Sequence, residues 1–536
     1  MTRLSLAIAL LLLAACQQTD TPQPASAEAA ATAAPAPFAF EEASIASLQE
    51  QMASGSLTSR ALAQAYLDRI AAIDDAGPRL NAVIEANPDA LKEADALDAE
   101  RKSGKLRGPL HGIPVLLKDN IDATPMVNSA GSLALAEHRP KSDAFLVARL
   151  RAAGAVILGK TNLSEWANIR STRSTSGWSA RGGQTRNPYA LDRNPCGSSA
   201  GTGTAIAANL AAVGIGTETD GSIICPSAVA GLVGIKPTVG LVSRSGIIPI
   251  SHSQDTAGPM ARSVADAAAV LTAIAAADAA DAATSEHPAR TAIDYTAHLK
   301  PDALKGARIG VLRKAMGYQP DVDAAFERAV AALKAAGATV VDAEIPTAGQ
   351  WGDAELEVLL YELKADLNAY LTSSGAPVKS LAGVIAFNKQ NAGTEMRYFA
   401  QELFEQAEAK GPLTDREYLD ARDKARRLAG PEGIDAALKK DNLDALVAPS
   451  MSPAWPTDPI NGDHFTGAGY GAAAVARYPS ISVPMGHSHG LPLGITFMGT
   501  AWSEARLVEL AHAYEQASKA RTPPKFLLTV DLDEAR

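Results

Sequence analysis

Two glycine-rich segments, each carrying serine, lie on either side of a run of small residues near the middle of the chain. The first is Gly197–Gly201 (Gly-Ser-Ser-Ala-Gly), and the second runs from Gly216 to Ser222. The residues between them, 202–213, are rich in alanine, threonine and glycine, which predicts a tight helix. Small side chains let a helix lie close to a sheet, so this region predicts closely packed helices and strands in a large α/β protein.

Short apolar runs alternate with helical patterns through the rest of the 536 residues. This alternation predicts a single large α/β domain, with a mixed central β-sheet that helices cover on both faces. The alanine-rich segment 273–284 is expected to be a surface linker within that domain. Strands are expected at 114–118, 155–160, 214–217, 307–312, 339–341 and 445–449, and helices at 88–103, 143–153, 202–213 and 322–336.

The charge balance excludes one class of partner. The chain has 49 Lys+Arg against 59 Asp+Glu, a formal net charge of −10, and no block of basic residues. A nucleic-acid partner is therefore not expected, because such partners require clustered positive charge. Nothing in the composition indicates an oligomeric state.

The N-terminal residues carry a targeting pattern. Arg3 precedes an apolar run, 4–13, which is too short to span a bilayer and ends in Leu-Ala-Ala-Cys at Cys16. This pattern resembles a bacterial lipoprotein signal, so residues 1–15 are expected to be removed and Cys16 to carry lipid. The alternative is an ordinary secretory signal with an incidental cysteine.

Residues 16–40 are rich in alanine, proline and threonine and predict a tether, which the folded domain, 41–536, follows. The chain is therefore expected to be exported to the cell envelope or periplasm and to touch a membrane only through a lipid anchor. Gln17, where retained lipoproteins carry aspartate, favours the outer membrane.

Two cysteines, Cys196 and Cys225, remain beyond Cys16. This number does not make a disulfide framework, so buried free thiols are expected. A single bridge is the alternative, because both residues lie near the serine segments.

Lys118 stands at the end of the apolar run 114–118. Serine can act as a nucleophile, desolvated lysine as a base, and a glycine-rich loop can turn its N–H groups toward an oxyanion. These residue types together predict acyl transfer. Two other lysines, Lys160 and Lys236, lack this context and are expected to be structural. No G-x-S-x-G segment presents the serines, which argues against a Ser-His-Asp site.

Several segments resemble the signature of the amidase signature family. The resemblance covers roughly residue 41 to the C-terminus, and its fold and activity are those of an α/β amide hydrolase. Within the family, 217–260 is most similar to the bacterial members that remove the C-terminal amide of peptides. The segments that carry the resemblance are His111–Pro114, Asp119–Asn120, Thr185–Pro188, Gly197–Gly201, Gly216–Ser222, Gly231–Thr238 and Gly490–Gly494.

The resemblance implies a Ser–cis-Ser–Lys triad without a metal or cofactor. By motif position Ser222 corresponds to the acylated nucleophile, Ser198 to the serine that follows a cis peptide bond, and Lys118 to the base. Burial would favour the neutral amine, which could then accept a proton from Ser222 through the hydroxyl of Ser198. Ser199 could be catalytic or cap a helix, and a supporting hydrogen bond is favoured.

The backbone of Thr219, Asp220, Gly221 and Ser222 is expected to form the oxyanion hole. Asp220 departs from the family pattern, which has glycine there, and it places a carboxylate beside that hole. This favours a neutral carboxamide over a free peptide C-terminus. Three further departures are Cys196, Glu218 and Ile224, which stand where members have glycine, aspartate and arginine, respectively.

The expected function is hydrolysis of the C-terminal carboxamide of peptides to the peptide acid and ammonia, through an acyl-enzyme. One alternative is a broad amidase that acts on small aliphatic or aromatic carboxamides. Another, from a different class, is a solute-binding lipoprotein or an inactive relative. The intact Lys118, Ser198 and Ser222 argue against that last alternative.

Overall fold

The computed structural model describes residues 37–286 and 293–532. Eleven strands form one sheet in the order β1-β3-β2-β6-β8-β7-β12-β13-β11-β9-β10, and β4 pairs with β5 separately. The strand bounds are β1 Val83–Ala86, β2 Pro114–Lys118, β3 Val156–Thr161, β4 Trp178–Ser179, β5 Gly183–Gln184, β6 Val213–Glu218, β7 Val233–Lys236, β8 Thr256–Ala261, β9 Arg308–Leu312, β10 Thr339–Ala343, β11 Ala445–Pro449, β12 Ser480–Ser488 and β13 Leu491–Met498.

The sheet is mixed, as predicted. β2 runs parallel to both β3 and β6, and β9 runs parallel to both β10 and β11, whereas the other pairs are antiparallel. Leu117 lies opposite Ile215 in the register of β2 and β6. The ends of these two parallel strands therefore lie side by side, and the strands deliver Lys118 and the second serine segment to the same edge.

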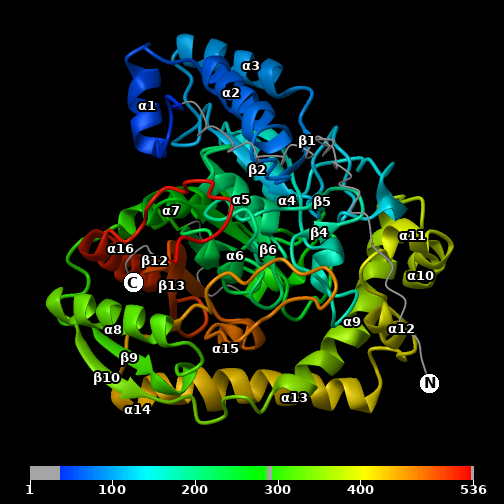
Figure 1. Ribbon diagram of the computed structural model, residues 1–536, viewed down its shortest axis with the longest axis vertical. Coiled ribbons are helices and arrows are strands. Elements are labelled where there is room, and N and C mark those ends of the chain that lie inside the picture. The colour runs from blue at the N-terminus through cyan, green and yellow to red at the C-terminus, as the bar shows by residue number, and fades with distance from the viewer. Residues whose placement is uncertain (1–36, 287–292, 533–536) are drawn as a thin grey trace, which may run out of the picture. The chain divides into compact units, whose positions relative to one another are not determined.

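Helices pack around this sheet (Figure 1), and the predicted α/β class is confirmed. The long α9 and the helices that follow it, α10 to α13, are drawn in colours from yellow-green to gold. The helix bounds are α1 Ile45–Ala53, α2 Ser59–Arg69, α3 Ala90–Lys102, α4 Phe145–Ala152, α5 Ala200–Ala207, α6 Ile224–Val229, α7 Val264–Ile274, α8 Pro320–Ala335, α9 Gly352–Ser373, α10 Leu381–Gln390, α11 Ala392–Glu395, α12 Glu402–Glu408, α13 Arg416–Ala429, α14 Asp435–Asp441, α15 Gly471–Val475 and α16 Glu504–Ser518.

The small residues of α5 are needed for its close packing. Every residue of this helix is buried, and a side chain at Gly201 would collide with the backbone of Ala82 and Asn162. The predicted extent, 202–213, is wrong at its C-terminal end. The helix stops at Ala207, and Asn209 adopts a left-handed conformation with φ 59° as the chain turns into β6.

The segment 273–284 is not a surface linker. α7 continues through Ile274, and the residues after it pack against the domain, with Ala283 and Thr284 buried. Asp281 forms an ion pair with Arg244 at 2.5 Å. The prediction failed because alanine-rich composition alone does not distinguish a flexible segment from a closely packed one.

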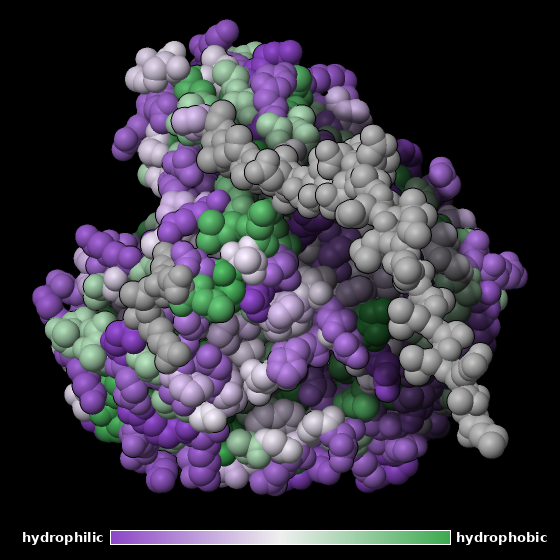
Figure 2. Space-filling view, in the orientation of Figure 1, coloured by the Kyte–Doolittle hydropathy of each residue, from purple (hydrophilic) through white to green (hydrophobic). Residues whose placement is uncertain are grey.

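The predicted signal, 1–15, the lipidated Cys16 and most of the tether lie outside the described residues. The last tether residues do not behave as a linker, because the rings of Phe38 and Phe40 pack against Tyr66. No helix in the described ranges is long and apolar enough to cross a membrane. On the face seen in Figure 2, hydrophilic residues predominate and apolar ones form small separate groups.

Candidate active site

Lys118, the last residue of β2, is completely buried. Its Nζ donates hydrogen bonds to Ser198 Oγ at 2.7 Å, to Thr217 Oγ1 at 2.8 Å and to the Thr217 carbonyl at 3.1 Å. Within the described residues it forms no ion pair with a carboxylate. The ammonium form is thus surrounded by neutral oxygens in a place that water does not reach.

Burial lowers the pKa of Lys118 from 10.5 to about 7, although the charges of Asp255 and Glu218 oppose this shift. Desolvation disfavours the charged form of an amine and therefore makes the neutral base available near neutral pH. A lysine with this pKa can accept a proton from a hydroxyl and return it later in a reaction.

The other two buried lysines have different surroundings. Lys160 pairs with Asp119 at 3.1 Å, and Lys236 donates to the Pro237 carbonyl at 3.1 Å. Burial also lowers the pKa of Lys236, to about 8, with Glu218 opposing the shift. Neither amine contacts a serine hydroxyl among the described residues, which agrees with the structural roles expected for them.

Ser198 lies between β5 and α5 and is 1% exposed. The peptide bond that precedes it, from Gly197, is cis, as the family resemblance implied. The Ser198 carbonyl accepts a hydrogen bond from the backbone N–H of Ser164 at 3.0 Å, while Oγ faces Lys118. Both the main chain and the side chain of this serine are therefore held in place.

Ser222 lies in the loop between β6 and α6. Its carbonyl accepts a hydrogen bond from the backbone N–H of Ser199 at 3.2 Å, which brings the two serine segments together. In the part of the chain that the structure describes, Ser222 Oγ has no hydrogen-bond partner, and the residue is 8% exposed. The structure thus joins Lys118 directly to Ser198 and leaves the adjacent Ser222 hydroxyl unengaged.

Ser199 supports this arrangement. Its Oγ donates to the Thr217 carbonyl at 3.1 Å and accepts from the Thr217 N–H at 3.2 Å. The residue occupies the N-cap position of α5, but its side chain makes no capping hydrogen bond. Ser199 therefore fastens the first serine segment to β6, which is the supporting role favoured from the sequence.

The loop 219–222 is held from both ends. Thr219 Oγ1 donates to Asp255 at 2.6 Å, and Glu218 Oε2 accepts from the N–H groups of Ile223 and Ile224 at 2.7 and 2.9 Å. Gly221 has φ 80°, and a side chain there would collide with Tyr470. Among the described residues the N–H groups of Asp220 and Ser222 have no acceptor, so they remain available to an oxyanion.

Asp220 is an exposed residue, and its carboxyl group lies near that of Glu355 in α9, so the two can share a hydrogen bond when one of them is protonated. The surrounding protein disfavours its charged form and the carboxylates of Glu355 and Glu218 repel it, so the pKa of Asp220 is raised well above its usual value. Burial likewise raises the pKa of Glu355, while Gln254 donates to its Oε1 at 3.0 Å. These shifts favour a pair that shares one proton beside the loop 219–222.

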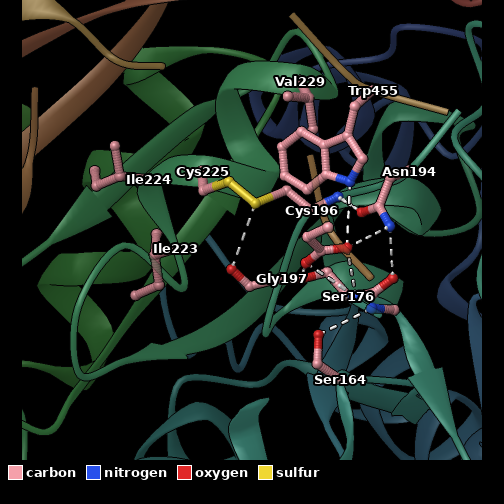
Figure 3. The surroundings of a disulfide bond; sticks show 12 residues. Ser164, Ser176, Asn194, Cys196, Gly197, Ile223, Ile224, Cys225, Val229 and Trp455 are labelled. Carbon is pink, nitrogen blue, oxygen red and sulfur yellow. Dashed lines mark hydrogen bonds between the residues drawn. A yellow bond between two sulfur atoms is a disulfide. The ribbon is translucent and has the colours of Figure 1, made fainter. Parts of the chain in front are cut away.

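Cys196 and Cys225 form a disulfide, with their Cα atoms 6.0 Å apart (Figure 3), so the expected free thiols are wrong. Cys196 lies two residues before Ser198 and Cys225 three residues after Ser222. The contact between the two serine segments therefore brings the sulfurs within bonding reach. The indole of Trp455 lies beside the bridge in Figure 3.

Several neighbours of the site were not singled out from the sequence. Asn120 Nδ2 donates to Thr217 Oγ1 at 3.0 Å. Both residues lie inside segments that carry the family resemblance, so the sequence offered a reason to consider them. Asp255 likewise lies in a segment that carries the resemblance. Glu355 had no such signal, because it is an ordinary acidic residue in the first turn of α9.

A cavity of about 350 Å³ lies beside this cluster. Thr217 and Thr219 form part of its wall, and apolar side chains, including Ile248 and Ala369, form much of the rest. A concave, mainly apolar space with a few polar groups is typical of a site for an organic substrate.

The comparisons with known proteins agree with this geometry. The family model described as Amidase matches residues 61–508. A probable amidase of Arabidopsis thaliana is 41% identical over 507 residues, which cover 91% of this chain and 93% of that protein.

Two solved structures are more similar still. The peptide amidase PAM in complex with the competitive inhibitor chymostatin is 61% identical, with a TM-score of 0.90, and the match covers 91% of this chain and 100% of that one. The native peptide amidase from Stenotrophomonas maltophilia is 60% identical over the same shares, with a TM-score of 0.89. This chain therefore belongs to the amidase signature family and is an amide hydrolase.

Proposed function

We propose that Lys118, Ser198 and Ser222 form the catalytic triad of a serine amidase. Ser222 Oγ attacks the carboxamide carbon, its proton passes to Ser198 Oγ, and the Ser198 proton passes to Lys118 Nζ. The observation that carries this proposal is the 2.7 Å hydrogen bond from a buried lysine with a pKa near 7 to Ser198. N–H groups of the loop 219–222 stabilise the oxyanion.

Collapse of the tetrahedral intermediate breaks the C–N bond, and the proton held by Lys118 returns through Ser198 to the leaving nitrogen. Ammonia departs and leaves an ester on Ser222. Water then attacks the ester carbon, its proton moves along the same path to Lys118, and Ser222 recovers its hydroxyl as the acid is released.

The preferred substrate in this proposal is a peptide with a C-terminal carboxamide. Support comes from the 61% identity to a peptide amidase and from the Asp220–Glu355 pair. A free peptide carboxylate near Asp220 would meet a like charge, whereas a carboxamide can donate a hydrogen bond to an acidic oxygen. The neighbouring cavity has room for the residues that precede the amide.

A substrate panel tests this proposal. Peptide amides, the corresponding free peptides and small aliphatic or aromatic carboxamides would be compared by ammonia release, with Ser222→Ala as the control. Peptide amides should have the highest kcat/KM. Comparable or higher kcat/KM for simple carboxamides would favour the broad amidase, and no turnover of any amide would favour a binding protein.

We also propose that the chain is exported and anchored through lipid on Cys16. The Leu-Ala-Ala-Cys sequence supports this, and so does the disulfide, because such bonds persist in oxidising compartments outside the cytosol.

A further inference from the structure

A second cavity, of about 470 Å³, adjoins the one described above, because Arg244 and His252 line both. Four arginines line this second cavity. Arg422 and Arg426 stand one turn apart on α13, and Arg477 follows α15, which packs beside α13 (Figure 1). Positive groups from three separate parts of the chain therefore converge on one space.

Among the described residues, one of the four guanidinium groups that line this cavity has no carboxylate partner. Arg426 has neither a hydrogen bond nor an ion pair from its side chain within the described ranges. The other three guanidinium groups each have a carboxylate within ion-pair distance, namely Arg244 with Asp281 at 2.5 Å, Arg422 with Asp423 at 2.9 Å and Arg477 with Glu286 at 3.4 Å.

Arg477 has the least exposed side chain of the four. Its side chain is only 15% exposed, and its Nε is buried with no hydrogen-bond partner among the described residues. Burial lowers the pKa of this arginine, and the positive charges of Arg426 and Arg244 lower it further, against the effect of Glu286. A buried donor without an acceptor is unfavourable, and an anionic oxygen in the cavity would satisfy it.

The cavity lies close to the oxyanion loop. Gln254 forms part of its wall, and Gln254 Nε2 lies 3.4 Å from the carbonyl oxygen of Thr219. A peptide whose terminal amide reaches the loop can therefore place earlier residues near the arginines. Guanidinium groups bind carboxylates through short, paired, charge-assisted hydrogen bonds.

We propose that this cavity binds an acidic side chain upstream of the C-terminal amide, so that the enzyme prefers acidic peptide amides; this inference rests on the proposed function. Arg426 and Arg477 would supply the main contacts.

The test compares pairs of peptide amides that differ only by Asp or Asn, or by Glu or Gln, at each upstream position. At low ionic strength the acidic member of a pair should have a kcat/KM about tenfold higher, as expected for a charge-assisted hydrogen bond. Added salt should reduce this preference, because exposed charges are screened. Arg426→Gln should bring the ratio of kcat/KM for the acidic and neutral peptides close to one, whereas Arg426→Lys should retain part of the preference.

Arg427→Gln is the matched control, because Arg427 is the next residue of α13, pairs with Glu432 at 2.6 Å and does not line the cavity. This variant should keep the full preference. Equal kcat/KM for acidic and neutral peptides in the natural enzyme would overturn the inference and leave the proposed function standing. A preference that survives in both Arg426→Gln and Arg477→Gln would also overturn it. If no peptide amide is hydrolysed, the proposed function and this inference both fall.

Discussion

The proposed mechanism makes the pH dependence of turnover a property of Lys118. If the neutral amine is the base, kcat/KM follows the deprotonated fraction of a group whose pKa lies at about 7. That fraction is about one tenth near pH 6 and about nine tenths near pH 8. The structure therefore predicts a tenfold rise in kcat/KM across this interval and a plateau above it.

A lysine with its ordinary pKa would behave differently. With a pKa of 10.5, the neutral fraction would increase about tenfold per pH unit through pH 8 and beyond, without a plateau. Initial rates on one peptide amide, measured at subsaturating concentration across this range, distinguish the two cases. A continuing rise above pH 8 would refute the burial argument.

Asp255 offers a sharper check. Its charge raises the pKa of Lys118, so Asp255→Asn should lower that pKa and shift the acidic limb of the profile to lower pH. Asp220→Asn separates this effect from titration of the Asp220–Glu355 pair. If the acidic limb disappears in Asp220→Asn, that limb reports titration of the Asp220–Glu355 pair.

Lys118→Met should reduce kcat by several orders of magnitude, while circular dichroism shows that the protein remains folded.

Four other perturbations have defined outcomes. Ser222→Ala should abolish labelling by a fluorophosphonate probe, and a label found on another serine by mass spectrometry would contradict the assignment. Replacing Cys196 and Cys225 with serine removes a disulfide that joins residues 29 positions apart, and should lower the free energy of unfolding by about 3.5 kcal/mol. Denaturant titration measures this value, and no change would show that the disulfide does not restrict the unfolded chain. The double variant Asp220→Asn, Glu355→Gln removes the charge of the carboxyl pair and should strengthen competitive inhibition by the free peptide acid, and an unchanged inhibition constant would show that charge repulsion does not set the specificity. Cys16→Ser should release the enzyme from membranes or block its maturation, as shown by cell fractionation. If the mature form of the unmutated protein is soluble and its N-terminus lies beyond Cys16, the lipid anchor is excluded.

The local patterns of the sequence predicted much of the fold. The strand expected at 114–118 is β2 within the same bounds, since an apolar run ended by a charged residue marks a buried strand clearly. Helix α5 was predicted too long, because its small residues continue through the turn that follows Ala207.

The site was predictable only in part. Lys118, Ser198 and Ser199 lie in recognisable segments, and the structure brings them to β6. Glu355 approaches Asp220 from 135 positions away in sequence, and no local pattern records such a tertiary contact. The disulfide was missed for a related reason, because its geometry depends on how closely two loops approach each other.

The order of strands bears on how this enzyme could be attached to a support for use as a biocatalyst. β6 leads into the loop 219–222, and six strands separate β6 from β10 at the far edge of the sheet. Thr339, the first residue of β10, is exposed and follows a tight turn at Gly337, where φ is 99°. A linker inserted at this turn would attach the protein to the support at the edge of the sheet that is distant from Lys118. The immobilised enzyme should therefore keep the residues around Lys118 undisturbed.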